Sequence, residues 1–205
     1  MSERKASSDK GPSDKRGPRI PRKITPERLA NIALHYLERY ASSSENLRRV
    51  LERRVFKASY HHADMDVEAA NGWIDDLIKR YQQAGLLNDL TYAETRARSL
   101  MSRGTAARVI RMKLIAKGVD TDTIDQALEA LVDEHPEPEL AAAIKLARRR
   151  RLGPYADPAK REEKKDRDLA AMARSGFSYD MARRVIECED TDELEDLLNP
   201  PLLGN

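Results

Sequence analysis

The chain has 205 residues and a formal net charge of +2, and 35% of its residues are charged whereas only 5% are aromatic. So many charges with so few aromatic side chains favour thin helical layers over a thick globular core, and no segment alternates β-branched residues as a strand would. No apolar run approaches the roughly 18 residues that cross a bilayer, and no apolar segment follows the basic N-terminus as it would in a secretory signal. The only cysteine, Cys188, excludes an intramolecular disulfide. We therefore expect an all-α, cytoplasmic protein.

Residues 1–24 are predicted to form a disordered basic tail. The segment Met1–Lys23 contains eight Lys or Arg, three Asp or Glu and almost no aliphatic side chain that could be buried. Such a segment cannot offset the conformational entropy that it would lose on ordering. It is interpreted either as a solubilising tail or as an arm that touches phosphates without reading their sequence.

Residues 25–88 carry three apolar stripes at helical spacing and are predicted to form a first three-helix repeat. Thr25 is a natural helix cap, and the helix that follows it is expected to run to about Tyr40. Ser42 and Glu45 have the spacing of a capping box for the second helix.

The insertion around residues 60–68 delays the third helix of this repeat and suggests a metal site, because it contains His61 and His62. Adjacent histidines point in different directions on a helix, and no CxxC or HExxH spacing accompanies them. A solvated loop is therefore the favoured interpretation. Asp64 or Asp66 is expected to cap the helix that follows.

Residues 89–133 are predicted to form a second repeat of three short helices. Gly104-Thr105 interrupts the first helix, and the Thr105 hydroxyl is expected to cap the second. The second helix ends at Lys117-Gly118, where a cation in the last turn precedes a glycine that tolerates positive φ. Asp120 opens the third helix. Helices of about ten residues bury too little apolar surface for this unit to stand alone, so further copies are expected beside it.

Residues 134–190 repeat the pattern weakly and are predicted to form a third repeat. Gly176 and Asp180 recur in the register of Gly118 and Asp122, which favours a true repeat over chance similarity between helices. The acidic residues 191–205 follow, either as a short closing helix or as a tail that screens basic surface. The predicted fold is thus an elongated array of three tandem three-helix repeats.

A block of basic residues lies within the third repeat. The segment Lys145–Arg167 holds ten Lys or Arg and four Asp or Glu, and it includes the run Arg148–Arg151. Four consecutive arginines cannot share one helical face. The block is interpreted either as a solvated surface or as a docking surface for an acidic groove or for phosphates.

Several segments together resemble the RecX family, which are bacterial regulators of the recombinase RecA. These segments read ALHYLERYASSSENLRRVL, LNDLTYAETRARS, KLIAKGVD and RSGFSYDMARRVI, and the resemblance spans roughly residues 24–187. Their most specific features are Leu87-Asn88-Asp89 followed by Tyr92-Ala93, and then Lys117-Gly118. The resemblance implies tandem three-helix repeats and a RecA filament as the protein partner.

No pattern of an enzyme is present in the sequence. The chain lacks a GxxxxGK[ST] phosphate loop and a GxSxG elbow, and Cys188 lies among acids that would raise its pKa. We therefore predict no catalytic residues, no cofactor and no metal site.

Three hypotheses for the function remain. Resemblance to RecX implies a monomeric regulator that lies along RecA filaments on DNA and mostly inhibits their ATPase, strand exchange and co-protease activity. The alternatives are a helical DNA-binding protein that acts through its basic patches, with weak binding to single- or double-stranded DNA, and an adaptor without a link to recombination. The predicted partner-binding residues are outward-facing cations of the second and third repeats: Arg103, Arg108, Arg111, Lys113, Lys117, Arg148, Arg149, Arg150 and Arg151.

Overall fold

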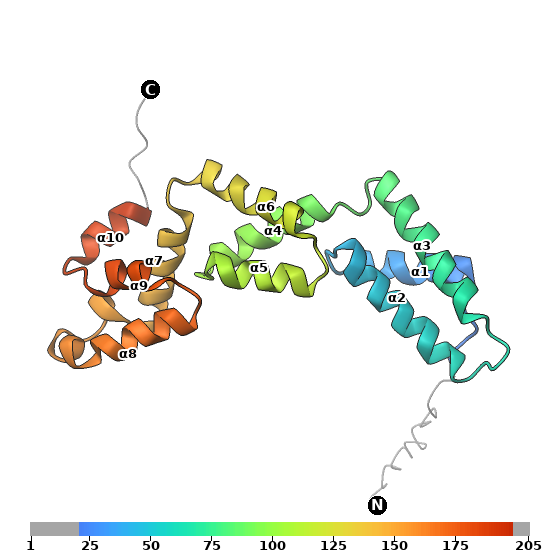
Figure 1. Ribbon diagram of the computed structural model, residues 1–205, viewed down its shortest axis with the longest axis horizontal. Helices are drawn as coiled ribbons and strands as arrows, with labels where there is room; N and C mark the ends of the chain where they lie inside the picture. Colours follow the sequence, from blue (N-terminus) through green and yellow to red (C-terminus); the bar gives the residue numbers. More distant parts are fainter. Residues whose placement is uncertain (1–20, 199–205) are drawn as a thin grey trace, which may run out of the picture.

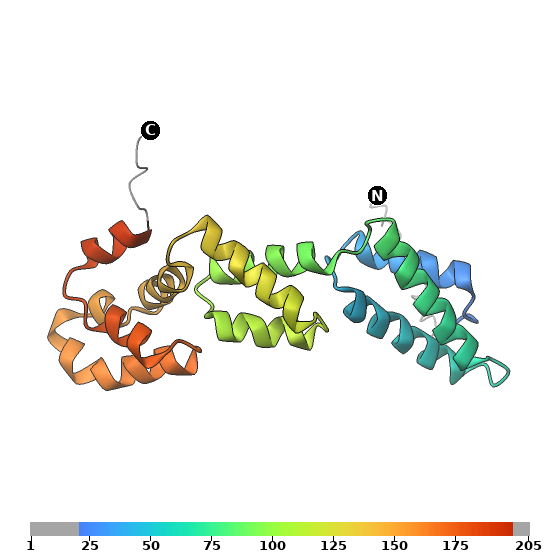
Figure 2. The ribbon, with the colours of Figure 1, turned by 45° about the horizontal axis from the view of Figure 1, so that its top comes forward.

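The computed structural model describes residues 21–198, which form ten α-helices, two short 3-10 turns and no strand. The helices lie in an elongated, curved row that runs from the N-terminal to the C-terminal end of the chain (Figures 1 and 2). This architecture confirms the predicted all-α, elongated array. The helices are α1 Pro26–Leu37, α2 Ser44–Ser59, α3 Val67–Gln83, α4 Asp89–Met101, α5 Ala107–Ala116, α6 Thr121–Glu134, α7 Pro138–Arg150, α8 Arg161–Arg174, α9 Tyr179–Ile186 and α10 Thr191–Leu198.

Three of the predicted helix caps are confirmed. The hydroxyl of Thr25 caps α1, and the carboxylates of Asp66 and Asp120 cap α3 and α6. Each accepts a hydrogen bond from the backbone amide three residues further on, at 3.2, 2.9 and 2.8 Å respectively. A cap of this kind contributes about 1 kcal/mol, because it satisfies an amide that the first helical turn leaves without a partner.

The boundary between α1 and α2 differs from the prediction. Helix α1 ends at Leu37, three residues before Tyr40. The cap of α2 is Ser43, whose hydroxyl accepts from the Asn46 amide at 3.2 Å, so the predicted capping box at Ser42 is wrong by one residue.

The predicted Thr105 cap of α5 is also wrong. The capping position is Ala106, which has no side chain that could accept a hydrogen bond. The amide of Ala107 donates instead to the carboxylate of Glu139 on α7, at 3.3 Å. A side chain from another helix therefore replaces the local cap.

The buried apolar residues form two separate cores. Helices α1 to α3 enclose the first, with Leu29, Leu47, Leu51 and Ile74 fully buried. Ile24 is only 4% exposed and belongs to this core, although it lies within the predicted tail; residues 1–20 of that tail lie outside the described residues.

The second core runs without interruption from α4 to α10. Its largest fully buried side chains come from both the middle and the C-terminal helices: Ile110, Leu114, Ile124, Leu140, Ile144 and Met172. Helices α4 to α10 are therefore packed as one body, whereas α1 to α3 form a separate core beside it. The predicted division into repeats of residues 25–88, 89–133 and 134–190 remains a proposal, because the second core continues across residue 133.

Candidate functional site

The joint between α1–α3 and the rest of the molecule is polar, and the motif Leu87-Asn88-Asp89 lies in it. Leu87 is buried in the first core, and the Asn88 side chain caps α4. The Asp89 carboxylate accepts a hydrogen bond from the Ser44 amide, at 2.7 Å, in the first turn of α2. The motif thus attaches the start of α4 to the start of α2.

The second motif, Lys117-Gly118, lies at the same joint. The Lys117 ammonium donates to Asn46 Oδ1 at 3.1 Å, and its carbonyl accepts from the Ser43 hydroxyl. Gly118 has φ +76°, and a Cβ added there would lie 2.2 Å from Cγ of Glu45 on α2. Both the backbone conformation and the close approach of α2 therefore require glycine. The two most specific motifs build the joint between the first and second units.

Gly176, in the turn between α8 and α9, makes a similar close approach to α5 within the second core. Its φ is +98°, and a Cβ there would lie 2.5 Å from Cγ2 of Val109 on α5. Gly118 and Gly176, which stand in register in the sequence, thus each lie in a turn that closely approaches another helix, α2 in the case of Gly118 and α5 in the case of Gly176.

Several of the nine predicted partner-binding cations have partners within the chain. Arg111 forms an ion pair with Asp125 of α6, and Arg148 forms one with Glu195 of α10 at 2.8 Å. Arg149 donates to the backbone carbonyl of Arg103 and so ties the end of α7 to the loop after α4. Together with Lys117, these residues at least partly support the fold.

Arg108 and Lys113 are exposed and make no ion pair within residues 21–198. They lie on α5, which contains three Lys or Arg and no Asp or Glu. Met112 and Ile115 of the same helix are 53% and 48% exposed. Arg108, Met112 and Ile115 are spaced i, i+4, i+7, so they share one face of α5. Lys113 lies about 100° further round the helix than Met112, on the flank of this face. We call Arg108, Met112 and Ile115, together with Lys113 on their flank, the α5 face.

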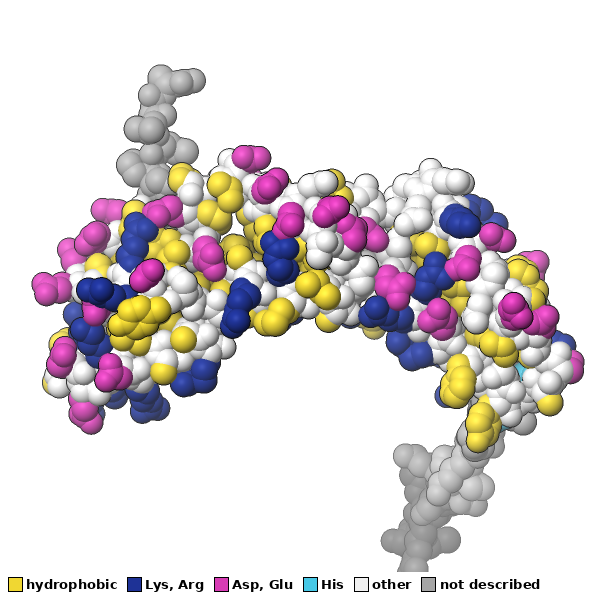
Figure 3. Space-filling model, viewed as in Figure 1, with side chains coloured by type: hydrophobic (Ala, Val, Ile, Leu, Met, Phe, Trp, Pro, Cys, Tyr) yellow, Lys and Arg dark blue, Asp and Glu magenta, His cyan; other side chains and the backbone are white. Residues whose placement is uncertain are grey.

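The α5 face lies opposite an acidic helix. Helix α6 contains five Asp or Glu and no Lys or Arg. In Figure 1, α6 follows the convex margin of the row and α5 follows the concave margin. Acidic side chains are accordingly prominent over α6 in Figure 3. The middle of the molecule thus presents positive charge on one margin and negative charge on the other, and exposed apolar side chains on both, since Val132 of α6 is 55% exposed.

Arg150 and Arg151 line a basic recess between the end of α7 and α8. Three further cations, Lys164, Arg167 and Arg174, line it from α8, and its volume is about 250 Å³. Asp168 at its base is 5% exposed and accepts a hydrogen bond from the Gly153 amide at 2.9 Å. This carboxylate is therefore engaged by the backbone, and the cations above it remain available to an anion.

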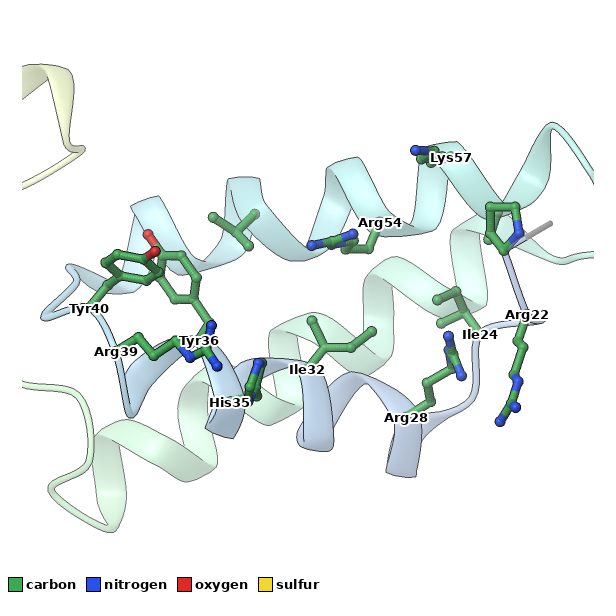
Figure 4. A pocket seen from close by; sticks show the side chains of 13 residues that line it. Arg22, Ile24, Arg28, Ile32, His35, Tyr36, Arg39, Tyr40, Arg54 and Lys57 are labelled. Atoms are coloured by element: carbon green, nitrogen blue, oxygen red, sulfur yellow. The ribbon is translucent and has the colours of Figure 1, made fainter. Parts of the chain in front are cut away.

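Sequence reasoning missed a groove of about 960 Å³ between α1 and α2 (Figure 4). The signal was present, since Arg28 on α1, Arg39 in the turn after it, and Arg54 and Lys57 on α2 are four cations on or beside neighbouring helices. Which faces of the two helices meet could not be known without the packing.

The described residues offer no metal site of the usual kind. Within residues 21–198, no three His, Cys, Asp or Glu side chains gather closely enough to hold an ion. His62 of the insertion contacts the Pro21 carbonyl at 2.8 Å. Burial, together with the nearby Glu193 carboxylate, raises the pKa of the Cys188 thiol and makes it a poor nucleophile at neutral pH. No helix in the described part is long and apolar enough to span a membrane.

Comparison with known proteins gives one consistent result. Residues 88–128 match the family of the second three-helix domain of RecX. A protein from Myxococcus xanthus named regulatory protein RecX is 43% identical over 188 residues, which cover 91% of this chain and 98% of that protein. A regulatory protein RecX from Streptomyces coelicolor is 34% identical over 152 residues, which cover 70% of this chain and 76% of that protein.

Solved structures show the same fold. A crystal structure of RecX from Lactobacillus salivarius has a TM-score of 0.56 at 21% identity, and the match covers 83% of this chain and 96% of that chain. A second crystal structure, of a regulatory protein RecX, also has a TM-score of 0.56, at 22% identity, with 79% of this chain and 71% of that chain covered. On the strength of its similarity to the Myxococcus xanthus protein along nearly its whole length, the chain belongs to the RecX family of regulatory proteins.

Proposed function

We propose that this protein binds RecA filaments on DNA and modulates them, mostly by inhibiting their ATPase, strand exchange and co-protease activity. Membership of the RecX family supports the regulatory role. The protein acts by binding and not by catalysis, as a monomer, in the cytoplasm where RecA filaments form. The single observation that carries the proposal beyond the family is the α5 face on the concave margin of an elongated molecule.

The shape of the molecule suits a filament as the partner. In an array of repeats each repeat contacts only its neighbours, so the exposed surface grows with the length of the row. A curved row can follow a helical groove and touch more than one subunit, and its middle then lies closest to the filament. Helix α5 forms the concave margin of this middle part (Figure 1).

The α5 face has the composition of an interface centre. Partly exposed Met112 and Ile115 would bury their remaining apolar surface on docking, for about 1 kcal/mol each because roughly half of each side chain is already covered. Arg108 and Lys113 would supply charge complementarity, which governs orientation and the rate of association more than affinity. Arginine and methionine are both enriched in protein interfaces.

Direct DNA binding is the second candidate, and the basic recess between α7 and α8 favours it. Five cations converge there on a space that can hold a phosphate group. Such contacts bind DNA in a strongly salt-dependent manner without reading sequence. The net charge of the whole chain is only +2, which favours the protein partner as the primary one.

The proposal is tested by titrating the protein into RecA ATPase assays on single-stranded DNA, from substoichiometric to equimolar ratios. Inhibition without comparable binding to bare DNA at physiological salt supports a filament regulator. An unchanged RecA ATPase together with tight, steeply salt-dependent DNA binding would replace it with the nucleic-acid function. If the protein neither changed the RecA ATPase nor bound DNA, both proposed functions would be refuted.

A further inference from the structure

The groove between α1 and α2 runs along one side of the first unit and has an aliphatic floor. Ile24 and Ile32 lie along its length (Figure 4), and Val50 of α2 also lines it. Helix α3 packs against both helices and completes the first core, which contains Ile24. Ile32 and Val50 remain only partly covered. The first unit therefore leaves part of its apolar surface open in the groove beside α1 and α2.

Cations alone provide the charged rim of this groove. Arg22, Arg28, Arg39, Arg54 and Lys57 line it, and no Asp or Glu is among the lining residues. None of these five forms an ion pair with another residue of the range 21–198. The Nε atom of Arg28 is buried and has no hydrogen-bond partner in this part of the chain. Unbalanced positive charge beside an apolar floor is complementary to an acidic, amphipathic partner.

Two tyrosines close one end of the groove. The rings of Tyr36 and Tyr40 lie 5.2 Å apart at an angle of 41°, and the Tyr36 hydroxyl accepts a hydrogen bond from Asn46 at 3.0 Å. Tyr40 is 57% exposed, so its hydroxyl is available to a ligand. Tyr36, in contrast, is partly buried, and its hydroxyl is already bound by Asn46.

The C-terminal end of the molecule contains a helix that is bound by groups of the same kind as those in the groove. Helix α10, with the sequence TDELEDLL, is short, acidic and amphipathic. Its Leu194 is 2% exposed, and its Glu195 accepts from the Arg148 guanidinium at 2.8 Å and from the Tyr155 hydroxyl at 3.0 Å. In α10, a leucine is thus buried among apolar side chains, and a neighbouring carboxylate binds an arginine and a tyrosine. The α1–α2 groove offers the same kinds of group to a ligand, namely aliphatic side chains, arginines and tyrosines.

We infer that the groove between α1 and α2 binds an acidic amphipathic helix of a protein partner. Leucine or isoleucine side chains of that helix lie on Ile24, Ile32 and Val50, as in other helix-in-groove complexes. Carboxylates on its flanks pair with Arg28 and Arg54 from the two walls. The groove belongs to α1–α3, whereas the α5 face lies on the other body of the molecule. The inference about the groove therefore does not require that the proposed partner of the α5 face be a RecA filament.

The aliphatic floor favours a helix over single-stranded nucleic acid. Nucleic-acid grooves combine cations with aromatic faces on which successive bases stack. Here the two rings pack against each other at one end, and the length of the groove is lined by branched aliphatic side chains instead. Oligonucleotide binding is therefore the competing outcome of the test.

The test uses the full chain and a fluorescent synthetic peptide of about 15 residues, long enough to form helix. The peptide has leucines at i, i+3, i+4 and i+7 and glutamates on both flanks. A scrambled peptide of the same composition lacks the apolar stripe. We expect the amphipathic peptide to bind and to shift the methyl NMR signals of Ile24, Ile32 and Val50, and the scrambled peptide to bind roughly tenfold more weakly.

Two charge reversals on α2 provide a matched pair. Arg54→Glu should weaken binding of the peptide roughly tenfold or more, because Arg54 lines the groove. Arg53→Glu changes the neighbouring exposed residue, which does not line the groove, and should leave binding nearly unchanged. Equal effects of the two reversals, equal binding of the scrambled peptide, or displacement of the peptide by oligo(dT) at physiological salt would overturn the inference.

Discussion

Replacing Gly118 by alanine should weaken the joint between the first unit and the rest of the molecule. At φ +76°, any residue with a Cβ is strained by about 1–2 kcal/mol. The new Cβ would also lie 2.5 Å from the Cβ of Glu45, which cannot rotate away, so α2 has to move. Overpacking of this kind costs a further amount of about 1–3 kcal/mol.

The chain can avoid the clash only by opening the joint. It would then lose the four hydrogen bonds that cross the joint, at about 1 kcal/mol each. The apolar core of α1–α3 is separate and would stay intact. Strain and overpacking together predict a loss of about 2–5 kcal/mol. Opening the joint keeps the strain and exchanges the overpacking for the four hydrogen bonds, which makes a loss of about 5–6 kcal/mol the upper limit.

Gly85→Ala is the matched control. Gly85 has φ +72°, but nothing lies within 4 Å of a Cβ added there, so only the backbone strain remains. Urea unfolding of both variants is followed by circular dichroism and by the fluorescence of Trp73, the only tryptophan, which packs against the first core. For Gly118→Ala we expect the larger loss and a changed small-angle scattering profile. Equal losses in the two variants, with unchanged scattering, would show that no close contact exists at Gly118.

Two further predictions concern stability. Asp168→Ala leaves the buried Gly153 amide without its acceptor and should cost about 1–3 kcal/mol in urea unfolding, whereas Asp168→Asn, which keeps an acceptor oxygen, should cost less; equal losses would contradict this role of the carboxylate. The guanidinium groups of Arg98 and Arg184 hold the pKa values of Glu134 and Glu137 below 4.5. Because folding lowers these pKa values, the stability they contribute is present above pH 4.5 and is lost as the pH falls through the folded-state values. Thermal unfolding across this range should show a shallower decline for Glu134→Gln than for the unchanged protein, and identical slopes would argue against the pair with Arg98.

The helical class, the elongated array and several helix starts could be predicted from local patterns. Caps such as Asp66 and Asp120 act within four residues of the chain, so the sequence around them contains all the necessary information. The Ala107 amide could not be assigned in this way, because its acceptor, Glu139, comes from another helix.

The division of the buried residues into one core for α1–α3 and one for α4–α10 could not be predicted from the sequence either. The interface of α4 to α6 with α7 depends on small residues such as Ala142 and Ala143, which carry little signal in a hydrophobic pattern. For the candidate site, the outward direction of Arg108 and Lys113 followed from helical spacing. The ion pair of Arg111 with Asp125 and the groove between α1 and α2 required knowledge of which helix faces meet.

The most direct test of the proposed function is co-sedimentation with RecA filaments on single-stranded DNA. The double variant Arg108→Glu/Lys113→Glu removes the two cations of the α5 face that have no ion pair in the described part of the chain. The control variant Lys79→Glu/Arg80→Glu makes the same change of charge at exposed positions of α3.

We expect the unchanged protein and the control variant to sediment with the filaments and to inhibit the RecA ATPase. The α5 variant should remain in the supernatant and retain its helical circular dichroism spectrum. Undiminished binding of the α5 variant would contradict the account, because it would remove the α5 face from the interface with the filament.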